Sequence, residues 1–149
     1  MISGNLAACA FVERSHLLRK VERDDLEEVF AAARLRCFEP GATIIREGEP
    51  GDELFLVQDG EVKVVTNSPA GAVELARLSR GAFFGEVALL TGRPRTATVT
   101  AVSDVTVIAI SNDAMEGILR RYPKVRKLLQ AVVEARVKST IEKTQGVAE

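Results

Sequence analysis

Residues 81–101 read GAFFGEVALLTGRPRTATVTA, and the order of residue types in this stretch is specific enough to anchor the rest of the chain. The two phenylalanines near its start are apolar and strand-like, and Gly85 breaks that strand. Residues 87–90 could form about one helical turn, and the Thr-Gly pair that follows is a stop signal. Residues 96–101 are rich in β-branched side chains and predict a strand.

The residues around Gly85 have the chemistry of a small anion site. A glycine before a helical turn lets backbone N–H groups point at an anion, because the first N–H groups of a helix lack internal partners. Arg95 adds a fork of donors that suits phosphate oxygens, and Glu86 is an acceptor for sugar hydroxyls. Together they suit a small sugar phosphate with a single negative charge. A nucleoside triphosphate would need a metal and a Gly-x-x-x-x-Gly-Lys-Ser/Thr loop, which the sequence lacks. A solvated pair of Arg95 and Glu86 in an ordinary turn is the alternative.

This stretch resembles the phosphate-binding cassette of the cyclic nucleotide-binding domain family. The family pattern is Phe-Gly-Glu-x-Ala-Leu, a short variable loop and then Arg-(Ala/Ser/Thr)-Ala-x-Val, and residues 84–89 and 95–99 supply both halves in order. Further matches are Phe38-x-Pro-Gly41, Gly48-x-x-Gly51-Asp52 and Phe55-x-Val57-x-x-Gly60, so that the resemblance covers roughly residues 17–133. It implies a mainly β fold with flanking helices, an eight-stranded antiparallel β-roll of the double-stranded β-helix or jelly-roll kind.

The resemblance also implies the ligand, a 3′,5′-cyclic nucleotide, and the roles of individual residues. Arg95 would hold the exocyclic phosphate oxygens, and backbone N–H groups around Ala88 and Leu89 would complete the anion site. Glu86 and the Gly85 backbone would form hydrogen bonds with the ribose 2′-hydroxyl. Apolar residues would line the base side of the pocket, namely Val62, Val64, Leu78 and Phe84. The nucleotide-binding set as a whole is Phe84, Gly85, Glu86, Val87, Ala88, Leu89, Arg95, Thr96, Ala97, Val64 and Leu78.

Thr96 and Asp52 bear further on the ligand through the same resemblance. A Thr or Ser at the position of Thr96 can hydrogen-bond the amino group of a syn guanine, so cGMP is permitted, although we favour cAMP. Asp52 stands where the family often has a carboxylate that orients the phosphate-binding arginine. A turn aspartate that satisfies its own loop is the alternative for Asp52.

A single domain over residues 1–149 is expected, with N-terminal helices at 1–34, the β-roll at 35–110 with the cassette at 83–99, and C-terminal hinge and lid helices at 111–144. Short strands at regular spacing with turn glycines also indicate an antiparallel sandwich or barrel. Within the roll, Asp59-Gly60 is interpreted as a hairpin turn.

The C-terminal helices are predicted from their caps and their apolar spacing. Ser111 is a plausible N-cap, and Pro123 can begin a new helix that runs to about Lys143, followed by a tail from Gln145. Arg136 is assigned to the basic polar face of that helix, which is interpreted as solvated, with an acidic partner as the alternative. Its opposite face is an amphipathic stripe, formed by Val125, Leu128, Leu129, Val132, Val133, Val137 and Ile141.

Composition excludes several functional classes. The 149 residues carry a net charge of −1, which argues against a nucleic-acid partner. The sequence has no apolar run long enough to span a membrane and no secretory pattern, which favours the cytoplasm. The single histidine, His16, argues against a His-rich metal site, and no catalytic nucleophile–base pair stands out. Cys9 and Cys37 both have apolar neighbours in sequence and are interpreted as buried thiols.

The sequence therefore predicts a regulatory module that binds cAMP or cGMP, is not an enzyme and signals through movement of its C-terminal helices. The final helix could contact an effector protein, belong to a larger chain or pair with a second copy as a homodimer. The alternative is an interaction or dimerisation module on the same roll with no physiological nucleotide.

Overall fold

The computed structural model describes residues 2–147, and its centre is a roll of two four-stranded antiparallel sheets. The first sheet has the order β1-β8-β3-β6 and the second the order β2-β7-β4-β5. The strands are β1 (Arg34–Phe38), β2 (Thr43–Ile45), β3 (Glu53–Asp59), β4 (Val62–Ser68), β5 (Gly71–Leu78), β6 (Phe83–Phe84), β7 (Thr98–Ala101) and β8 (Val105–Ser111). The predicted eight-stranded antiparallel β-roll is confirmed.

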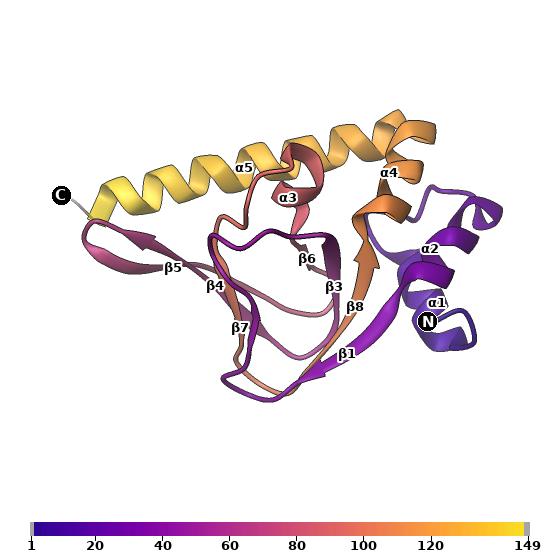
Figure 1. The fold of residues 1–149 in the computed structure, drawn as a ribbon, viewed down its shortest axis with the longest axis horizontal. Coiled ribbons are helices and arrows are strands. Elements are labelled where there is room, and N and C mark those ends of the chain that lie inside the picture. Colours follow the sequence, from indigo (N-terminus) through magenta and orange to yellow (C-terminus); the bar gives the residue numbers. More distant parts are fainter. Residues whose placement is uncertain (1, 148–149) are drawn as a thin grey trace.

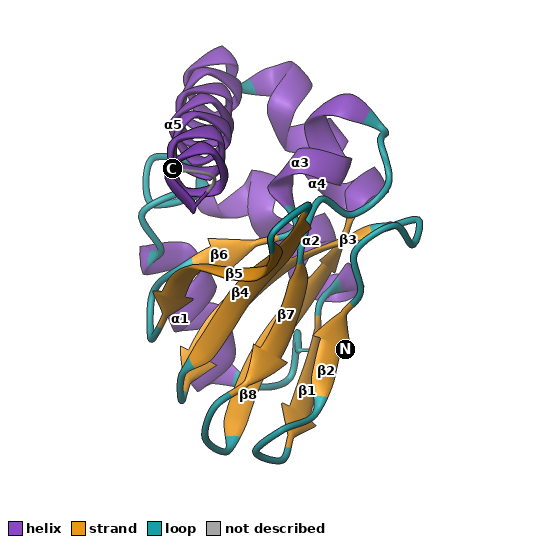
Figure 2. Ribbon diagram, turned by 90° about the vertical axis from the view of Figure 1, so that its left-hand side faces the viewer, coloured by secondary structure: helices purple, strands orange, loops and turns teal. Residues whose placement is uncertain are grey.

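Helical segments surround the roll on one side and at one end (Figure 2). They are α1 (Leu6–Arg14), the 3-10 turn η1 (Arg23–Leu26), α2 (Glu27–Ala32), α3 (Glu86–Thr91), α4 (Asn112–Arg121) and α5 (Pro123–Val147). Figure 1 shows α5 as a long rod that passes α3 and reaches β5 at its C-terminal end. The tail predicted from Gln145 is wrong for residues 145–147, because α5 continues through them.

The corner between α4 and α5 follows the local signals in the sequence. The Ser111 side chain accepts a hydrogen bond from Ala114 N at 3.3 Å, which confirms it as the N-cap of α4. Pro123 is the first residue of α5, where its missing N–H costs no helical hydrogen bond. A proline at this position therefore divides one helix from the next without a loss of backbone pairing.

The turn at Asp59-Gly60 connects the two sheets and is not a hairpin. β3 pairs with β6 and β8, whereas β4 pairs with β5 and β7. The turn needs a glycine, because Gly60 has φ +90° and a Cβ there would lie 2.2 Å from the Asp104 carbonyl oxygen. An Asp-Gly pair indicates a reversal of the chain, but which strands then pair depends on contacts across the whole roll.

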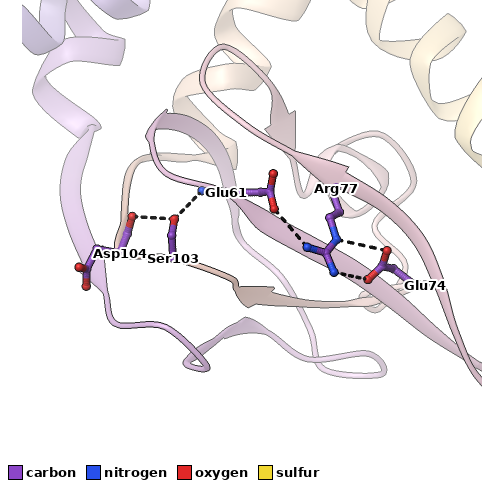
Figure 3. Close-up of polar contacts among 5 residues, drawn as sticks. All are labelled: Glu61, Glu74, Arg77, Ser103 and Asp104. Carbon is purple, nitrogen blue, oxygen red and sulfur yellow. Dashed lines mark hydrogen bonds and ion pairs between the residues drawn. The ribbon is translucent and has the colours of Figure 1, made fainter.

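The hairpin of this region is formed by β4 and β5, which pair from Val62↔Leu78 to Ser68↔Gly71. On its exposed surface Arg77 forms ion pairs with Glu74 at 3.2 Å and with Glu61 at 3.3 Å (Figure 3). The hydrogen bond from Arg77 is the main reason that the pKa of Glu74 is lowered. Exposed pairs of this kind contribute little to stability, so the paired backbones hold the hairpin together.

The first sheet separates two apolar cores. On β8, Val105, Val107 and Ala109 face the interior of the roll, whereas Ile108 and Ile110 pack against the helices. The helical core also contains residues from α2, α4 and α5, including Val29, Phe30, Met115, Ile118 and Leu129. Burial of a large apolar side chain contributes roughly 1.5–3 kcal/mol, so both faces of this sheet stabilise the fold.

The two cysteines lie in different environments. Cys9 is buried, and desolvation raises the pKa of its thiol. Cys37 is exposed on the edge strand β1, so the prediction of a buried thiol is wrong there. No helix within residues 2–147 is long and apolar enough to cross a membrane.

Candidate nucleotide-binding site

The cassette folds as a strand, a glycine and the short helix α3. Gly85 lies just before α3 with φ +90°, and Gly92 follows it with φ +69°. A Cβ on Gly85 would lie 2.9 Å from both Arg95 Nη1 and the Glu53 carbonyl oxygen. Glycine is therefore required here for its conformation and for the close approach of Arg95.

Arg95 is buried, with 7% of its surface exposed. Its Nη1 donates to Gly85 O at 3.3 Å and its Nη2 donates to Glu53 O at 3.1 Å. Desolvation lowers the pKa of Arg95, and the nearby charges of Asp52, Glu53 and Glu86 act in the opposite direction. A guanidinium has more N–H donors than these two bonds use. Arg95 therefore still has donors for an anionic ligand while it is bonded to the backbone.

Backbone carbonyl groups, not the Asp52 carboxylate, hold the guanidinium. Asp52 is exposed, and within residues 2–147 no ion pair joins it to Arg95. Gly51, its neighbour, lies directly against Arg95, since a Cβ there would be 2.2 Å from Cζ. Asp52 therefore acts on Arg95 only through its charge.

Glu86 is almost completely buried, with 3% of its surface exposed, and it forms an ion pair with Arg136 of α5. Its Oε1 lies 2.7 Å from Arg136 Nη1. Arg136 Nη2 also donates to Phe83 O at 2.8 Å, and the guanidinium lies over the Phe83 ring at 5.3 Å. The assignment of Arg136 to a solvated face is wrong. Its spacing of four residues from Val132 was the signal that placed it on the inner face.

A cavity of about 300 Å³ lies between the cassette, the second sheet and α5. This volume is at the lower end of the range of roughly 300–1,000 Å³ for small-molecule sites. All predicted nucleotide-binding residues line it except Leu89, whose side chain is buried in the helical core. Val62 does not line it either and packs inside the roll. Thus Phe84, Gly85, Glu86, Val87, Ala88, Arg95, Thr96, Ala97, Val64 and Leu78 meet at one cavity.

The cavity has further walls that were not predicted from the sequence. The roll adds Ile45, Leu75, Ala76 and Val99, and α5 adds Arg136, Val137, Ser139, Thr140 and Ile141. Val137 and Ile141 were expected on the buried stripe of the final helix. They are 46% and 48% exposed and lie at the rim of the cavity. The site is thus chemically mixed, since the buried charges of Arg95 and Glu86 lie at the cassette and the other walls are mainly apolar but include Thr96, Arg136, Ser139 and Thr140.

The described residues contain no cluster of three or more His, Cys, Asp or Glu side chains that could hold a metal ion. The charged groups of the site are two arginines and one buried glutamate. This donor set suits an anionic organic ligand, because guanidinium groups bind phosphate oxygens and a carboxylate accepts from hydroxyl groups.

Comparison with known proteins agrees with this chemistry. Residues 35–122 match the family model described as cyclic nucleotide-binding domain. The match covers more than half of the chain, so the chain belongs to the cyclic nucleotide-binding domain family.

Individual relatives include channels and kinase subunits. A cyclic nucleotide-gated potassium channel of Mesorhizobium japonicum is 36% identical over 114 residues, which are 76% of this chain and 30% of the channel. The regulatory domain of Toxoplasma gondii PKA, solved with cAMP, is similar with a TM-score of 0.75 and 27% identity over 85% of this chain and 48% of that chain. The regulatory subunit of a cAMP-independent protein kinase A from Trypanosoma brucei is similar with a TM-score of 0.76 and 25% identity over 84% of this chain and 45% of that chain. The chain thus spans about a third of the channel and just under half of each kinase structure.

Proposed function

We propose that the chain binds a 3′,5′-cyclic nucleotide in this cavity, cAMP in preference to cGMP, and signals through movement of α5. The observation that carries the proposal is the cavity itself. It combines a buried arginine and a buried glutamate with other walls that are mainly apolar. A cyclic nucleotide has the matching parts, which are a singly charged phosphate, a ribose hydroxyl and a flat base.

Each part of the nucleotide is assigned to a wall of the cavity. Arg95 binds the exocyclic phosphate oxygens with the donors that its two backbone bonds leave unused. Glu86 and the Gly85 backbone form hydrogen bonds with the ribose hydroxyl. The backbone N–H groups of residues 87–89 donate to the phosphate. The base lies against Val64, Leu78 and Phe84. The preference for cAMP is supported by the Toxoplasma gondii relative, which was solved with that ligand.

Helix α5 is assigned the role of a lid. Arg136 ties it to the cassette through Glu86 and Phe83 O, and Lys143 donates to Leu75 O on β5. Because Glu86 is also the proposed ribose acceptor, the ribose and Arg136 interact with the same carboxylate. A nucleotide that binds one position of α5 better than another shifts its equilibrium by no more than that difference in affinity.

Calorimetric titration of the nucleotide-free protein tests the proposal directly. We expect one cyclic nucleotide per chain, with cAMP tighter than cGMP. Equal affinities for 5′-AMP and cAMP would contradict recognition of the cyclic phosphate. Absence of binding for both cyclic nucleotides at concentrations of roughly tens of micromolar would overturn the proposal.

Thr96 is exposed at the cavity, and its hydroxyl is the group proposed to permit cGMP. Thr96→Ala should weaken cGMP binding by roughly three- to tenfold, the effect of one hydrogen bond, and should leave cAMP binding within about twofold. Titration of both nucleotides with both proteins measures this. Equal losses for both ligands would mean that Thr96 does not read the base.

The second candidate is an interaction module that uses no nucleotide. Two observations favour it. Glu86 already has a partner in Arg136, and the Trypanosoma brucei relative is described as cAMP-independent. The exposed Val137 and Ile141 would then face a partner protein or a second copy. In either case we propose a regulatory, non-catalytic role in the cytoplasm. The effector would be a separate protein or another part of a larger chain that contains this domain.

A further inference from the structure

Asn112, the first residue of α4, contacts the loop that surrounds Arg95. Its backbone N–H donates to Asp52 O at 2.8 Å, and its side-chain Nδ2 donates to Gly51 O at 3.3 Å. Gly51 is also the residue that lies directly against the Arg95 guanidinium. Gly51 therefore contacts both Arg95 and Asn112.

Other backbone groups of this loop, which spans residues 46–52, and of Glu53 at the start of β3 are bonded to Arg95 itself. Arg95 N donates to Glu49 O at 2.8 Å, and Gly48 N donates to Arg95 O at 2.8 Å. Further along, Glu53 O accepts from Arg95 Nη2 at 3.1 Å. The direction of the guanidinium thus depends on where the loop backbone lies, and Asn112 holds that backbone at Gly51 and Asp52.

The side-chain amide of Asn112 has a defined orientation. Its Oδ1 is buried and accepts no hydrogen bond from residues 2–147. A buried acceptor without a donor is unfavourable, yet rotation of the amide would bring Oδ1 against Gly51 O, which is also an acceptor. The bond from Nδ2 to Gly51 O therefore determines the orientation of the amide.

We infer that Asn112 is a positioning residue for the phosphate site, which holds Gly51 against Arg95 and couples the direction of that guanidinium to α4. The inference rests on the proposed function only in taking the ligand of Arg95 to be a phosphate. The contact lies at the first residue of α4, and α5 begins at Pro123, two residues after the last residue of α4.

A double-mutant cycle tests the coupling through binding. Asn112→Ala should weaken cAMP binding by roughly three- to tenfold, and it should have no further effect in an Arg95→Ala background. Additive losses in the double variant would overturn the inference, because Asn112 would then act independently of Arg95.

Two more variants separate positioning from stability. Asn112→Asp keeps the size but loses the Nδ2 donor, and it places a carboxylate oxygen without a donor against Gly51 O. It should therefore bind cAMP at least as weakly as Asn112→Ala and should also melt at a lower temperature. Ser111→Ala is the matched control, because it removes the N-cap of the same helix and leaves the loop contacts in place. It should lower the melting temperature and keep the affinity. An Asn112→Asp variant with wild-type affinity would overturn the inference.

Hydrogen exchange measured by NMR without ligand tests the same contact independently of nucleotide binding. The amides of Gly48 and Arg95, which bond the loop to Arg95, should exchange at least about tenfold faster in Asn112→Ala than in Ser111→Ala. Unchanged rates at both amides would overturn the inference even if cAMP binds the wild type. Faster exchange in a protein that binds no cyclic nucleotide would support the coupling and contradict the proposed function instead.

Discussion

Arg95→Ala is expected to weaken cAMP binding at least about a hundredfold, because each charge-assisted hydrogen bond contributes about 1.5–3 kcal/mol and the fork makes more than one. The side chain is buried, and its two bonds to backbone carbonyls hold it at the cavity before a ligand arrives. Little of its binding energy is therefore spent on ordering. Arg95→Lys should recover only part of the affinity, since a lysine is a point charge without the fork.

Titration calorimetry of both variants measures this effect, and circular dichroism checks that they are folded. Arg93→Ala is the matched control, because Arg93 lies in the same loop but is exposed. It should bind like the wild type. A folded Arg95→Ala protein with wild-type affinity would show that the phosphate is bound elsewhere or that the ligand has none.

Arg136→Ala should release α5 from the cassette and speed the dissociation of cAMP at least about tenfold. The variant loses the ion pair to Glu86 and the hydrogen bond to Phe83 O. Charged bonds of this kind contribute about 1.5–3 kcal/mol each, and about 1.4 kcal/mol corresponds to a tenfold change. We apply the lower figure, because the Arg136 side chain is 34% exposed and solvent screens it. Glu86 would also keep a buried charge without this partner, so the ligand-free protein should melt at a lower temperature.

Stopped-flow displacement of a fluorescent cAMP analogue gives the dissociation rate. Arg126→Ala is a suitable comparison, since Arg126 is an exposed arginine on the same helix. Arg136→Lys should give an intermediate rate, because it keeps a charge near Glu86 but cannot also bond Phe83 O with the same geometry. If Arg136→Ala released cAMP at the wild-type rate, α5 would not be a lid held by this pair.

The cassette residues could be predicted because their contacts are local. Gly85, Glu86 and Arg95 lie within eleven consecutive positions, and the order strand, glycine, helix and turn brings them to one cavity. Gly48 likewise has the positive φ that its turn implies. Gly51 is different, because it is required for the packing of Arg95 against it and not for an unusual backbone angle.

The contribution of α5 could not be predicted because it depends on how a distant helix docks. Arg136 reaches Glu86 across fifty positions of sequence, and its basic neighbours on α5 made a solvated face the simpler interpretation. Val137 and Ile141 have the spacing of core residues, yet the docked helix leaves both at the cavity rim. Periodicity identifies an apolar stripe, but it does not say how much of that stripe a partner surface covers.

From the sequence alone one could infer the cassette that contains Arg95, because its short spacings depend on local backbone geometry, and the resemblance carried by that cassette implied the family and the eight-stranded antiparallel roll. Three features could be seen only in the folded chain. They are the change of sheet at Asp59-Gly60, the hydrogen bonds from Arg95 to two backbone carbonyl groups, and the ion pair between Arg136 and Glu86. These features join segments far apart in sequence. Which segments pair is decided by packing and by the need to pair buried charges and polar groups. A local sequence pattern does not contain that information.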